Sequence, residues 1–317
     1  MINLFLYRHP QIIPVQNPFN LQRIRLTLLS LVISPQTQAW IDNYNTEKTK
    51  EAALYSYRSL FGYLDRQDID EKEWIESMKE SDDAKYHKLS EMVNDVANYV
   101  EPASVKMYYN FWKAYLRFVH GIKIYNEDAR YFVKPPKNIK RQREPLTREI
   151  IKAICDDSDE TRRAEYLVLA SSGMRMSEFL NSDQESFDLE NKIIVIKGKL
   201  TKTKTERITF ITTQAVEAIH EAGSTFWQKR TYHKEATYFH RVRERLGFTE
   251  RYDDSIVHKV TLHAFRAWTR TKAGKINQDF AEALLGHAGY LSKSYVRLSK
   301  QEMLKYYARL EPSLRIY

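Results

Sequence analysis

Apolar side chains recur at helical spacing through much of the chain, and this pattern predicts a largely α-helical protein. In the first half, three stretches keep their apolar residues on one helical face. They span residues 52–64, 89–99 and 105–119. Such a face is stable when it packs against another element, so each helix is expected to bury one side. The many aromatic side chains of 105–119 are expected to pack in a core rather than stack on bases.

The second half is expected to combine helices with a small sheet. Two β-branched runs, 193–196 and 208–211, flank a polar stretch rich in lysine and threonine, which predicts a β-hairpin. The first helix of this half begins with Thr147 as its N-cap. Further helices are expected over 164–171, 213–222, 235–246, 262–272 and 279–285. The predicted fold class is mainly α with a small antiparallel β-sheet in the second half.

A segment rich in proline and charge separates the two halves. It runs from Lys134 to Pro145, and its prolines forbid a continuous helix while its charges keep it in solvent. We therefore expect a linker at 134–145, a helical domain at 36–133 and a second domain at 146–317. Residues 1–35 receive no role, although a short helix is possible at 21–33.

The distribution of charge favours a polyanionic partner. The 50 Lys and Arg residues exceed the 41 Asp and Glu residues by 9, and the excess is uneven. Residues 65–83 are acidic, whereas 134–148 and 197–207 are strongly basic, which is typical of a face turned toward a phosphate backbone. The single cysteine, Cys155, excludes an intrachain disulfide and a metal cluster built on cysteines. No apolar run is long enough to span a bilayer, and no secretory signal is expected.

Two segments present cations suited to a phosphate. Ser172-Gly173-Met174-Arg175 delivers an arginine to the start of a helix, where Glu178 lies on the same face and can hold it. A guanidinium held in this way can bind a phosphate through two N–H groups. Lys199, next to Gly198 in the hairpin, can reach into a groove and donate a proton to a leaving oxygen. Taken alone, each is also compatible with an ordinary solvated charge.

Two later segments add histidines and a tyrosine. The spacing of His263 and Arg266 puts an imidazole and a guanidinium on one helical face, where one can move a proton and the other can neutralise phosphate charge. Gly286 is expected to end a helix and present His287, and Tyr295 follows eight residues later. The order of these four segments is more informative than any one of them.

Together, these residues resemble the signature of the tyrosine recombinases, the family of phage integrases and Xer-like enzymes of mobile elements and viruses. That signature runs Arg, Lys, His-x-x-Arg, Leu-Gly-His, Tyr. The matching positions are Arg175, Lys199, His263, Arg266, His287 and Tyr295. The resemblance covers residues 146 onward, and the helical first domain is similar to the family's core-binding domain. It implies an integrase-type clamp of two domains around DNA.

The sequence departs from the family pattern at two places. The nucleophile of the family usually lies nine residues after the Leu-Gly-His histidine, and that position here is Val296. Shortening the intervening loop by one residue accounts for Tyr295. The hairpin also carries Lys202 and Lys204, which compete with Lys199 as the catalytic lysine. Lys199 is preferred because it alone follows a glycine.

The resemblance implies that Tyr295 attacks the scissile phosphate and leaves a 3′-phosphotyrosine and a free 5′-hydroxyl. Arg175, Arg266 and His287 would bind the non-bridging oxygens, and His263 would act as the general base. Lys199 would protonate the departing 5′-oxygen. No metal or nucleotide cofactor is expected, because the covalent bond conserves the energy of the broken phosphodiester.

The implied partner is double-stranded DNA, with self-association to a tetramer at synapsis and no membrane contact. Basic side chains of the linker and hairpin are expected to contact the DNA. They are Lys137, Lys140, Arg141, Arg143, Lys202 and Lys204. Residues 299–317 are expected to pack on a neighbouring protomer. The expected location is the cytoplasm, at the nucleoid, of a prokaryotic or viral host.

Two other functions are compatible with the same residues. One is a type IB topoisomerase, which shares the chemistry but relaxes supercoils as a monomer. The other is a DNA-binding protein that has lost catalysis. The Leu-Gly-His segment and its short distance to Tyr295 favour a recombinase, and the complete ordered set argues against a decayed site. Tyr306 and Tyr307 are alternative nucleophiles, although their amphipathic stretch is expected to be a docked helix.

Overall fold

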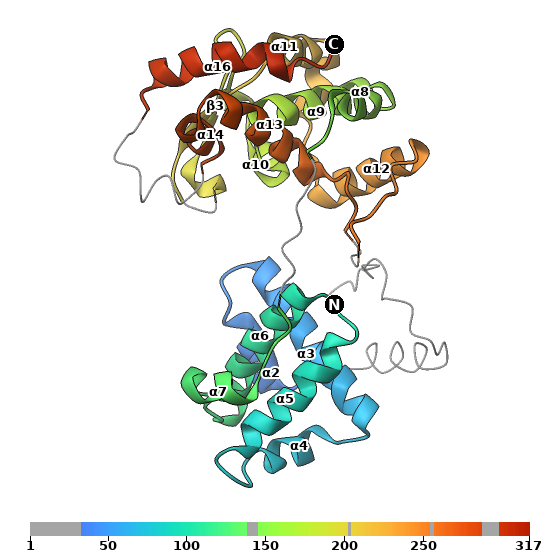
Figure 1. Ribbon diagram of the computed structural model, residues 1–317, viewed down its shortest axis with the longest axis vertical. Helices are drawn as coiled ribbons and strands as arrows, with labels where there is room; N and C mark the ends of the chain where they lie inside the picture. Colours follow the sequence, from blue (N-terminus) through green and yellow to red (C-terminus); the bar gives the residue numbers. More distant parts are fainter. Residues whose placement is uncertain (1–32, 138–144, 202–203, 254–256, 287–297) are drawn as a thin grey trace. The chain divides into compact units, whose positions relative to one another are not determined.

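The computed structural model describes residues 33–137, 145–201, 204–253, 257–286 and 298–317. The chain divides into two compact units, Met1–Arg141 (unit 1) and Gln142–Tyr317 (unit 2), each with its own hydrophobic core (Figure 1). This division falls within the segment expected to be a linker. The short helix expected at 21–33 lies almost entirely outside the described residues. In the described parts of the chain, none of the helices combines the length and apolar character that a membrane span needs.

The described part of unit 1 is helical. Its helices are α2 (Pro35–Asp42), α3 (Glu47–Gln67), α4 (Glu71–Ser77), α5 (Ala84–Ala97), α6 (Pro102–His120) and α7 (Asn126–Phe132). The three amphipathic stretches of the sequence correspond to α3, α5 and α6, so that part of the prediction is confirmed. The sequence analysis did not predict α2, α4 or α7. Each has only seven or eight residues, which is too short for a helical period to stand out.

Three aromatic side chains of α6, those of Tyr109, Trp112 and Tyr115, are buried in the core of unit 1, as expected, whereas Phe118 of the same helix is 51% exposed. Trp112 is 1% exposed, and its indole N–H donates a hydrogen bond of 2.7 Å to the carbonyl of Ser56 in α3. Tyr115 packs edge-on against Trp40 of α2, with ring centroids 5.2 Å apart, and its hydroxyl donates to Glu71 of α4. One helix therefore ties together α2, α3 and α4.

Unit 2 combines helices with one small sheet. The helices are α8 (Arg148–Asp156), α9 (Glu160–Ser172), α10 (Met176–Asn181), α11 (Thr213–Ala222), α12 (Tyr232–Arg245), α13 (Leu262–Ile276), α14 (Gln278–Leu285) and α16 (Lys300–Leu314). The strands are β1 (Phe187–Asp188), β2 (Ile193–Ile196) and β3 (Arg207–Phe210). Within the described residues, three short 3₁₀ segments accompany them: η1 (Gln184–Ser186), η2 (Gly198–Leu200) and η3 (Gly223–Trp227).

The sheet is antiparallel in the order β1-β2-β3. In its central pairing, Ile194 of β2 faces Thr209 of β3. The predicted hairpin and the predicted fold class, mainly α with a small antiparallel sheet, are confirmed. The third strand was not expected, because β1 has only two residues and shows no alternation of its own.

Helix α9 lies at the centre of unit 2. Every residue from Ala164 to Ser172 is buried, and the helix packs against α8, α11, α13 and α16. Tyr166 stacks on Phe265 of α13, with ring centroids 5.5 Å apart. A helix that is buried on all sides is typical of the middle of a domain rather than its surface.

Side chains from three other elements donate hydrogen bonds to the carbonyl groups at the C-terminal end of α9. The donors are the hydroxyl of Thr269 to Ala170, that of Tyr307 to Ser171, that of Thr209 to Ser172, and the guanidinium of Arg266 to Gly173. The last carbonyls of a helix have no partner within it, and burial without one is costly. The end of α9 therefore fixes where α13, α16 and β3 must lie.

Helix α16 docks on its own unit. Met303, Tyr307, Leu310 and Leu314 are buried, and Glu311 forms an ion pair of 2.8 Å with Lys192. Within the single chain, the apolar face of α16 therefore packs on its own unit. The expectation that residues 299–317 pack on a neighbouring protomer stays a prediction. An amphipathic pattern shows that one face is buried but not which surface covers it.

We expect Leu310→Ala to destabilise unit 2 by about 2–5 kcal/mol, because it removes a fully buried side chain from the interface of α16. The measurement is calorimetric unfolding of the full chain. Leu304→Ala is the matched control, since Leu304 lies on the same helix and is 37% exposed. Its cost should stay below about 0.5 kcal/mol. Equal effects of the two substitutions would show that α16 is not docked in this way.

Candidate active site

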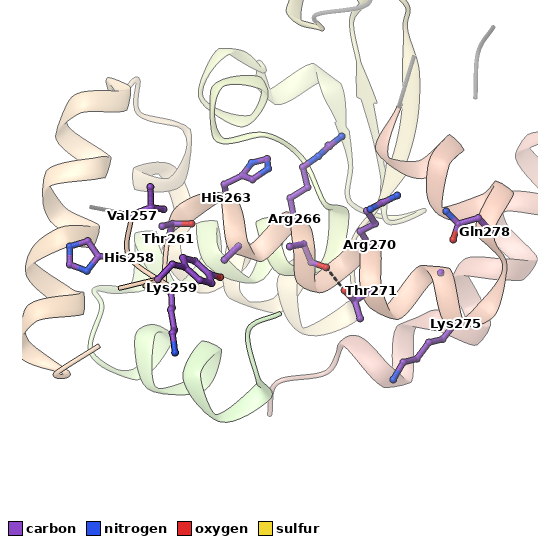
Figure 2. A pocket seen from close by; sticks show the side chains of 14 residues that line it. Val257, His258, Lys259, Thr261, His263, Arg266, Arg270, Thr271, Lys275 and Gln278 are labelled. Atoms are coloured by element: carbon purple, nitrogen blue, oxygen red, sulfur yellow. Dashed lines mark hydrogen bonds between the residues drawn. The ribbon is translucent and has the colours of Figure 1, made fainter. Parts of the chain in front are cut away.

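Helix α13 presents two of the predicted site residues. His263 and Arg266 lie one turn apart, and Figure 2 shows their side chains leaving α13 on the same side. His263 is exposed, whereas Arg266 is 4% exposed. Both line a cavity of about 680 Å³, along with Arg270 of the same helix.

Basic side chains outnumber acidic ones in the described lining of this cavity. Its other basic lining residues are His258, Lys259 and Lys275, and none of the described residues that line it is acidic. Arg270 pairs with Glu282 and Lys259 with Glu250. Figure 2 shows the side chains of Lys259 and Lys275 pointing away from those of His263 and Arg266.

Arg266 is held by main-chain oxygens from two directions. Its Nη1 donates to the carbonyl of Gly173 and its Nη2 to the carbonyl of Leu285, each at 2.6 Å. Gly173 has a φ of 63°, and a Cβ at this position would lie 2.5 Å from Cδ2 of Leu285. Glycine is therefore required where the end of α9 meets the end of α14, and this close approach sets the place of Arg266.

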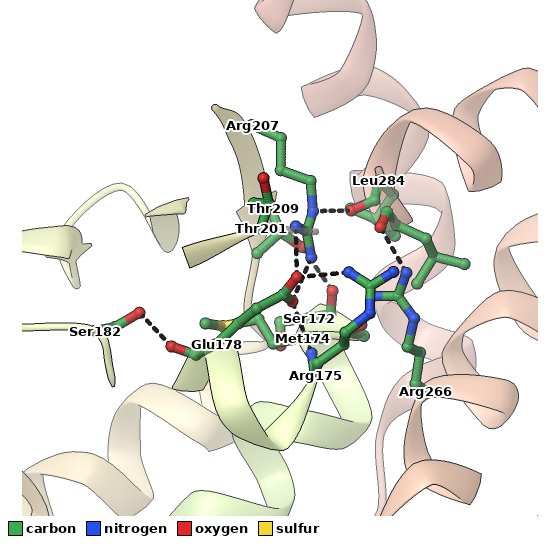
Figure 3. A network of polar contacts seen from close by, with 12 residues as sticks. Ser172, Met174, Arg175, Glu178, Ser182, Thr201, Arg207, Thr209, Arg266 and Leu284 are labelled. Atoms are coloured by element: carbon green, nitrogen blue, oxygen red, sulfur yellow. Dashed lines mark hydrogen bonds and ion pairs between the residues drawn. The ribbon is translucent and has the colours of Figure 1, made fainter. Parts of the chain in front are cut away.

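Arg175 begins α10 directly after this turn and is fixed by Glu178, as the sequence indicated (Figure 3). The backbone N–H of Arg175 donates to Oε2 of Glu178 at 2.8 Å, and its Nη1 donates to Oε1 at 2.6 Å. The Glu178 side chain is 1% exposed, whereas that of Arg175 is 24% exposed. The carboxylate thus lies beneath the arginine and leaves part of the guanidinium accessible.

Arg207 of β3 is a third guanidinium in this cluster, and the sequence analysis did not single it out. It forms a fork with Glu178, with Nη1 at 3.1 Å from Oε1 and Nη2 at 2.8 Å from Oε2. Its side chain is only 8% exposed. In the sequence, Arg207 and Thr209 alternate with Ile208 and Phe210, a pattern typical of the polar face of a strand. The structure buries Thr209 and nearly buries Arg207, and no local pattern signals this.

The cluster carries more positive than negative charge. In the described part of the chain, Arg175 and Arg207 hydrogen-bond to one carboxylate, that of Glu178, while Arg266 bonds to carbonyls. Burial tends to raise the pKa of Glu178, but its hydrogen bonds and ion pairs with Arg207 and Arg175 outweigh this and hold the pKa below its usual value.

Burial, together with the neighbouring charges of Arg175 and Arg207, lowers the pKa of Arg266 to about 9. The guanidinium is therefore still protonated at neutral pH, although burial and its neighbours disfavour that charge. Placing an anion beside Arg175 and Arg266 relieves this repulsion, which makes the cluster suited to a phosphate.

Two of the three candidate lysines lie at the end of the hairpin. Lys199 is exposed in η2, which lies against α10, and Lys204 is exposed with a left-handed φ of 56°. A Cβ on Gly198 would lie 2.9 Å from the carbonyl oxygen of Lys204, so glycine is required where these two segments approach. The third candidate, Lys202, lies outside the described residues.

The remaining predicted residues are mostly outside the described part of the chain. These are His287 and Tyr295 of the site, and Lys140, Arg141 and Arg143 of the linker. Lys137 is described and exposed.

Gly286 ends α14 with a φ of 65°, as expected for a C-cap. Among the described residues, no group of His, Cys, Asp or Glu side chains converges in a way that could hold a metal ion.

The two alternative tyrosines pack into unit 2. Tyr307 is 3% exposed and donates a hydrogen bond of 3.2 Å to the carbonyl of Ser171, and burial raises its pKa well above the usual value. It is therefore unsuited to act as a nucleophile. Tyr306 is half-buried and stacks on Phe280 of α14, with ring centroids 5.5 Å apart.

Known proteins that resemble this chain are integrases and recombinases. A sequence model of the phage integrase family matches residues 142–302, just over half of the chain. No curated protein sequence matches the chain significantly.

Solved structures of recombinases resemble the chain in fold. The lambda integrase bound to DNA is 17% identical with a TM-score of 0.56, covering 84% of this chain and 95% of that one. The Tn1549 transposon integrase bound to transposon right end DNA is 13% identical with a TM-score of 0.56, covering 88% and 99%. The XerH site-specific recombinase bound to its palindromic difH substrate is 16% identical with a TM-score of 0.51, covering 89% and 92%.

We expect sulfate to raise the Tm of the full chain by occupying the guanidinium cluster. A site filled at ten times its dissociation constant contributes about 1.4 kcal/mol. The effect should weaken as the pH rises through about 9, because Arg266 then loses its proton. Thermal unfolding in sulfate, compared with chloride at equal ionic strength, measures it.

Two variants separate this binding from the general effect of sulfate on stability. Arg266→Gln should lose most of the sulfate-dependent shift relative to its own baseline. Arg245→Gln should keep the shift, because Arg245 pairs with Asp157 on the surface. An undiminished response in Arg266→Gln would contradict anion binding at the cluster.

Proposed function

Because the chain belongs to the phage integrase family, the tyrosine recombinases, we propose that it is a site-specific recombinase that cuts and rejoins DNA through a 3′-phosphotyrosine on Tyr295. The observation that carries this proposal is the geometry of Arg175 and Arg266. Both guanidinium groups are fixed by buried partners. With Arg207 they form a cluster of three positive charges beside one carboxylate, that of Glu178, which pairs with Arg175 and Arg207. A pentacoordinate phosphate, which gains negative charge during the reaction, is the species that such a site stabilises best.

In the proposed reaction, the phenolic oxygen of Tyr295 bonds to the scissile phosphorus and the bond from phosphorus to the 5′-oxygen breaks. A phenol with a pKa near 10 is ionised to about one part in a thousand at pH 7, so forming the phenolate costs about 4 kcal/mol. The positive cluster lowers this cost, and His263 accepts the proton as general base. Lys199 donates a proton to the departing 5′-oxygen, and rejoining is the reverse sequence.

The non-bridging oxygens are assigned to Arg175, Arg266 and His287. Glu178 fixes Arg175, and the carbonyls of Gly173 and Leu285 fix Arg266, so neither guanidinium needs to move when charge develops on the phosphate. Preorganised donors of this kind are the largest single contribution to many enzymatic rate enhancements. The proposed chemistry uses no metal and no nucleotide.

The proposed substrate is double-stranded DNA, the ligand in the lambda and Tn1549 integrase structures. We assign backbone contacts to the basic side chains of the linker and hairpin, which are Lys137, Lys140, Arg141, Arg143, Lys202 and Lys204. Since recombination exchanges strands between two duplexes, we propose that four protomers assemble at synapsis. Such a reaction belongs at the nucleoid, in the cytoplasm of a prokaryotic cell or of one that a virus has infected.

We expect the wild-type protein to form a covalent adduct with nicked duplexes in the absence of metal, with the attachment at Tyr295. A pool of randomised nicked duplexes traps the intermediate, and mass spectrometry of the digested adduct locates the bond. Tyr295→Phe should abolish the adduct, while Tyr306→Phe should retain it. Attachment at another tyrosine would replace the nucleophile, and supercoil relaxation without a preferred site would favour a topoisomerase. Tight DNA binding without an adduct would favour a protein that only binds DNA.

We expect Lys199→Ala to slow cleavage by about 10²–10⁴-fold, because it removes the general acid. The test compares Lys199→Ala, Lys202→Ala and Lys204→Ala on two substrates, one normal and one with sulfur in place of the bridging 5′-oxygen. A thiolate leaves without protonation, so the sulfur substrate should restore the rate only for the variant that lacks the catalytic lysine. Restoration in Lys202→Ala or Lys204→Ala, and not in Lys199→Ala, would transfer the role to that residue.

A further inference from the structure

Arg207 joins three parts of the candidate active site through one side chain. It extends from β3, forms a fork with Glu178 of α10 and donates from Nε to the carbonyl of Leu284 in α14 at 3.2 Å (Figure 3). We propose that Arg207 is a positioning residue for DNA strand cleavage, acting through Glu178 and through the end of α14. This inference rests on the proposed recombinase function and adds a residue that does not itself touch the phosphate.

The contact between Arg207 and Glu178 limits how far Glu178 neutralises the positive charge of Arg175. Each oxygen of Glu178 accepts two hydrogen bonds, one from Arg175 and one from Arg207. Four donors on one carboxylate fix its rotation and share its negative charge between two cations. Without Arg207, the carboxylate would pair with Arg175 alone and neutralise the charge that Arg175 needs for the phosphate.

The second contact holds the turn that leads to the nucleophile. Two consecutive carbonyls at the end of α14 accept from guanidinium groups, that of Leu284 from Arg207 and that of Leu285 from Arg266. The next residue, Gly286, lies so close to Arg207 that a Cβ on it would be 2.6 Å from Cδ of the arginine. The chain therefore leaves α14 from a point fixed by both guanidinium groups, and it continues directly to His287.

A lysine cannot reproduce these contacts, because a single ammonium group lacks both the fork to a carboxylate and the separate Nε–H. This difference distinguishes positioning from a general need for positive charge. If charge alone mattered, Arg207→Lys would act like the wild type. If geometry matters, Arg207→Lys should fall well below it, and Arg207→Gln further still.

The experiment measures single-turnover adduct formation, DNA affinity and Tm for the full-length wild type, Arg207→Gln and Arg207→Lys. Arg245→Gln is the matched control, since Arg245 also pairs with a carboxylate, that of Asp157, but is half exposed. We expect Arg207→Gln to slow adduct formation at saturating DNA by about 100-fold. DNA affinity should change by less than about threefold. Wild-type rates in Arg207→Gln, or a rate loss that disappears at saturating DNA, would overturn the proposal.

Hydrogen exchange provides a readout that does not depend on cleavage. Amides in the peptide 278–286 should exchange faster in Arg207→Gln than in the wild type, and at the wild-type rate in Arg245→Gln. Unchanged hydrogen exchange in Arg207→Gln would overturn the proposal that Arg207 holds the end of α14, even if the cleavage rate fell. If the wild type forms no adduct at all, the proposed function fails, and exchange at the end of α14 still decides whether Arg207 positions this turn.

Discussion

The C-terminal end of α9 must have its carbonyl groups hydrogen-bonded in the interior of unit 2, and the arrangement of that unit follows from this constraint. A helix end in solvent would leave those groups to water. Here Thr269, Tyr307, Thr209 and Arg266 supply the donors, from α13, α16 and β3. The elements that carry the candidate site are therefore placed by the same bonds that make burial of α9 possible.

The side chain of Arg266 both satisfies two buried carbonyl groups and places a positive charge in the candidate site. A guanidinium has five N–H groups, and Arg266 uses two of its donors on the carbonyls of Gly173 and Leu285. The same bonds that help to join α9 to α14 also orient the remaining donors. Because its charge is disfavoured by burial and by two neighbouring arginines, the fold bears a cost in stability at the position proposed to bind an anion.

Much of the fold could be predicted from the sequence, because long amphipathic helices and a β-branched hairpin have strong periods. The pairing of Arg175 with Glu178 and the cap at Gly286 were also predictable, since they depend on residues close in sequence. Arg207 was not, because its partner Glu178 lies 29 positions away and nothing in a local pattern indicates that pair.

The surface that covers α16 was not predictable for a related reason: an amphipathic pattern indicates a buried face but not its partner. Packing of residues 299–317 on a neighbouring protomer stays a prediction. The roles of His287 and Tyr295 remain predictions. They rest on the order of motifs in the sequence, and both residues lie outside the described part of the chain.

The bonds at the end of α9 also bear on when the site can form during folding. The donors lie 37 to 136 positions from the carbonyls they reach, so all four contacts are non-local. Contacts of this kind require large loops to close first. A partly folded chain can contain α9, α13 and the hairpin and still lack the guanidinium cluster. Assembly of the guanidinium cluster is therefore coupled to completion of the fold, and a partly folded chain would lack the proposed phosphate site.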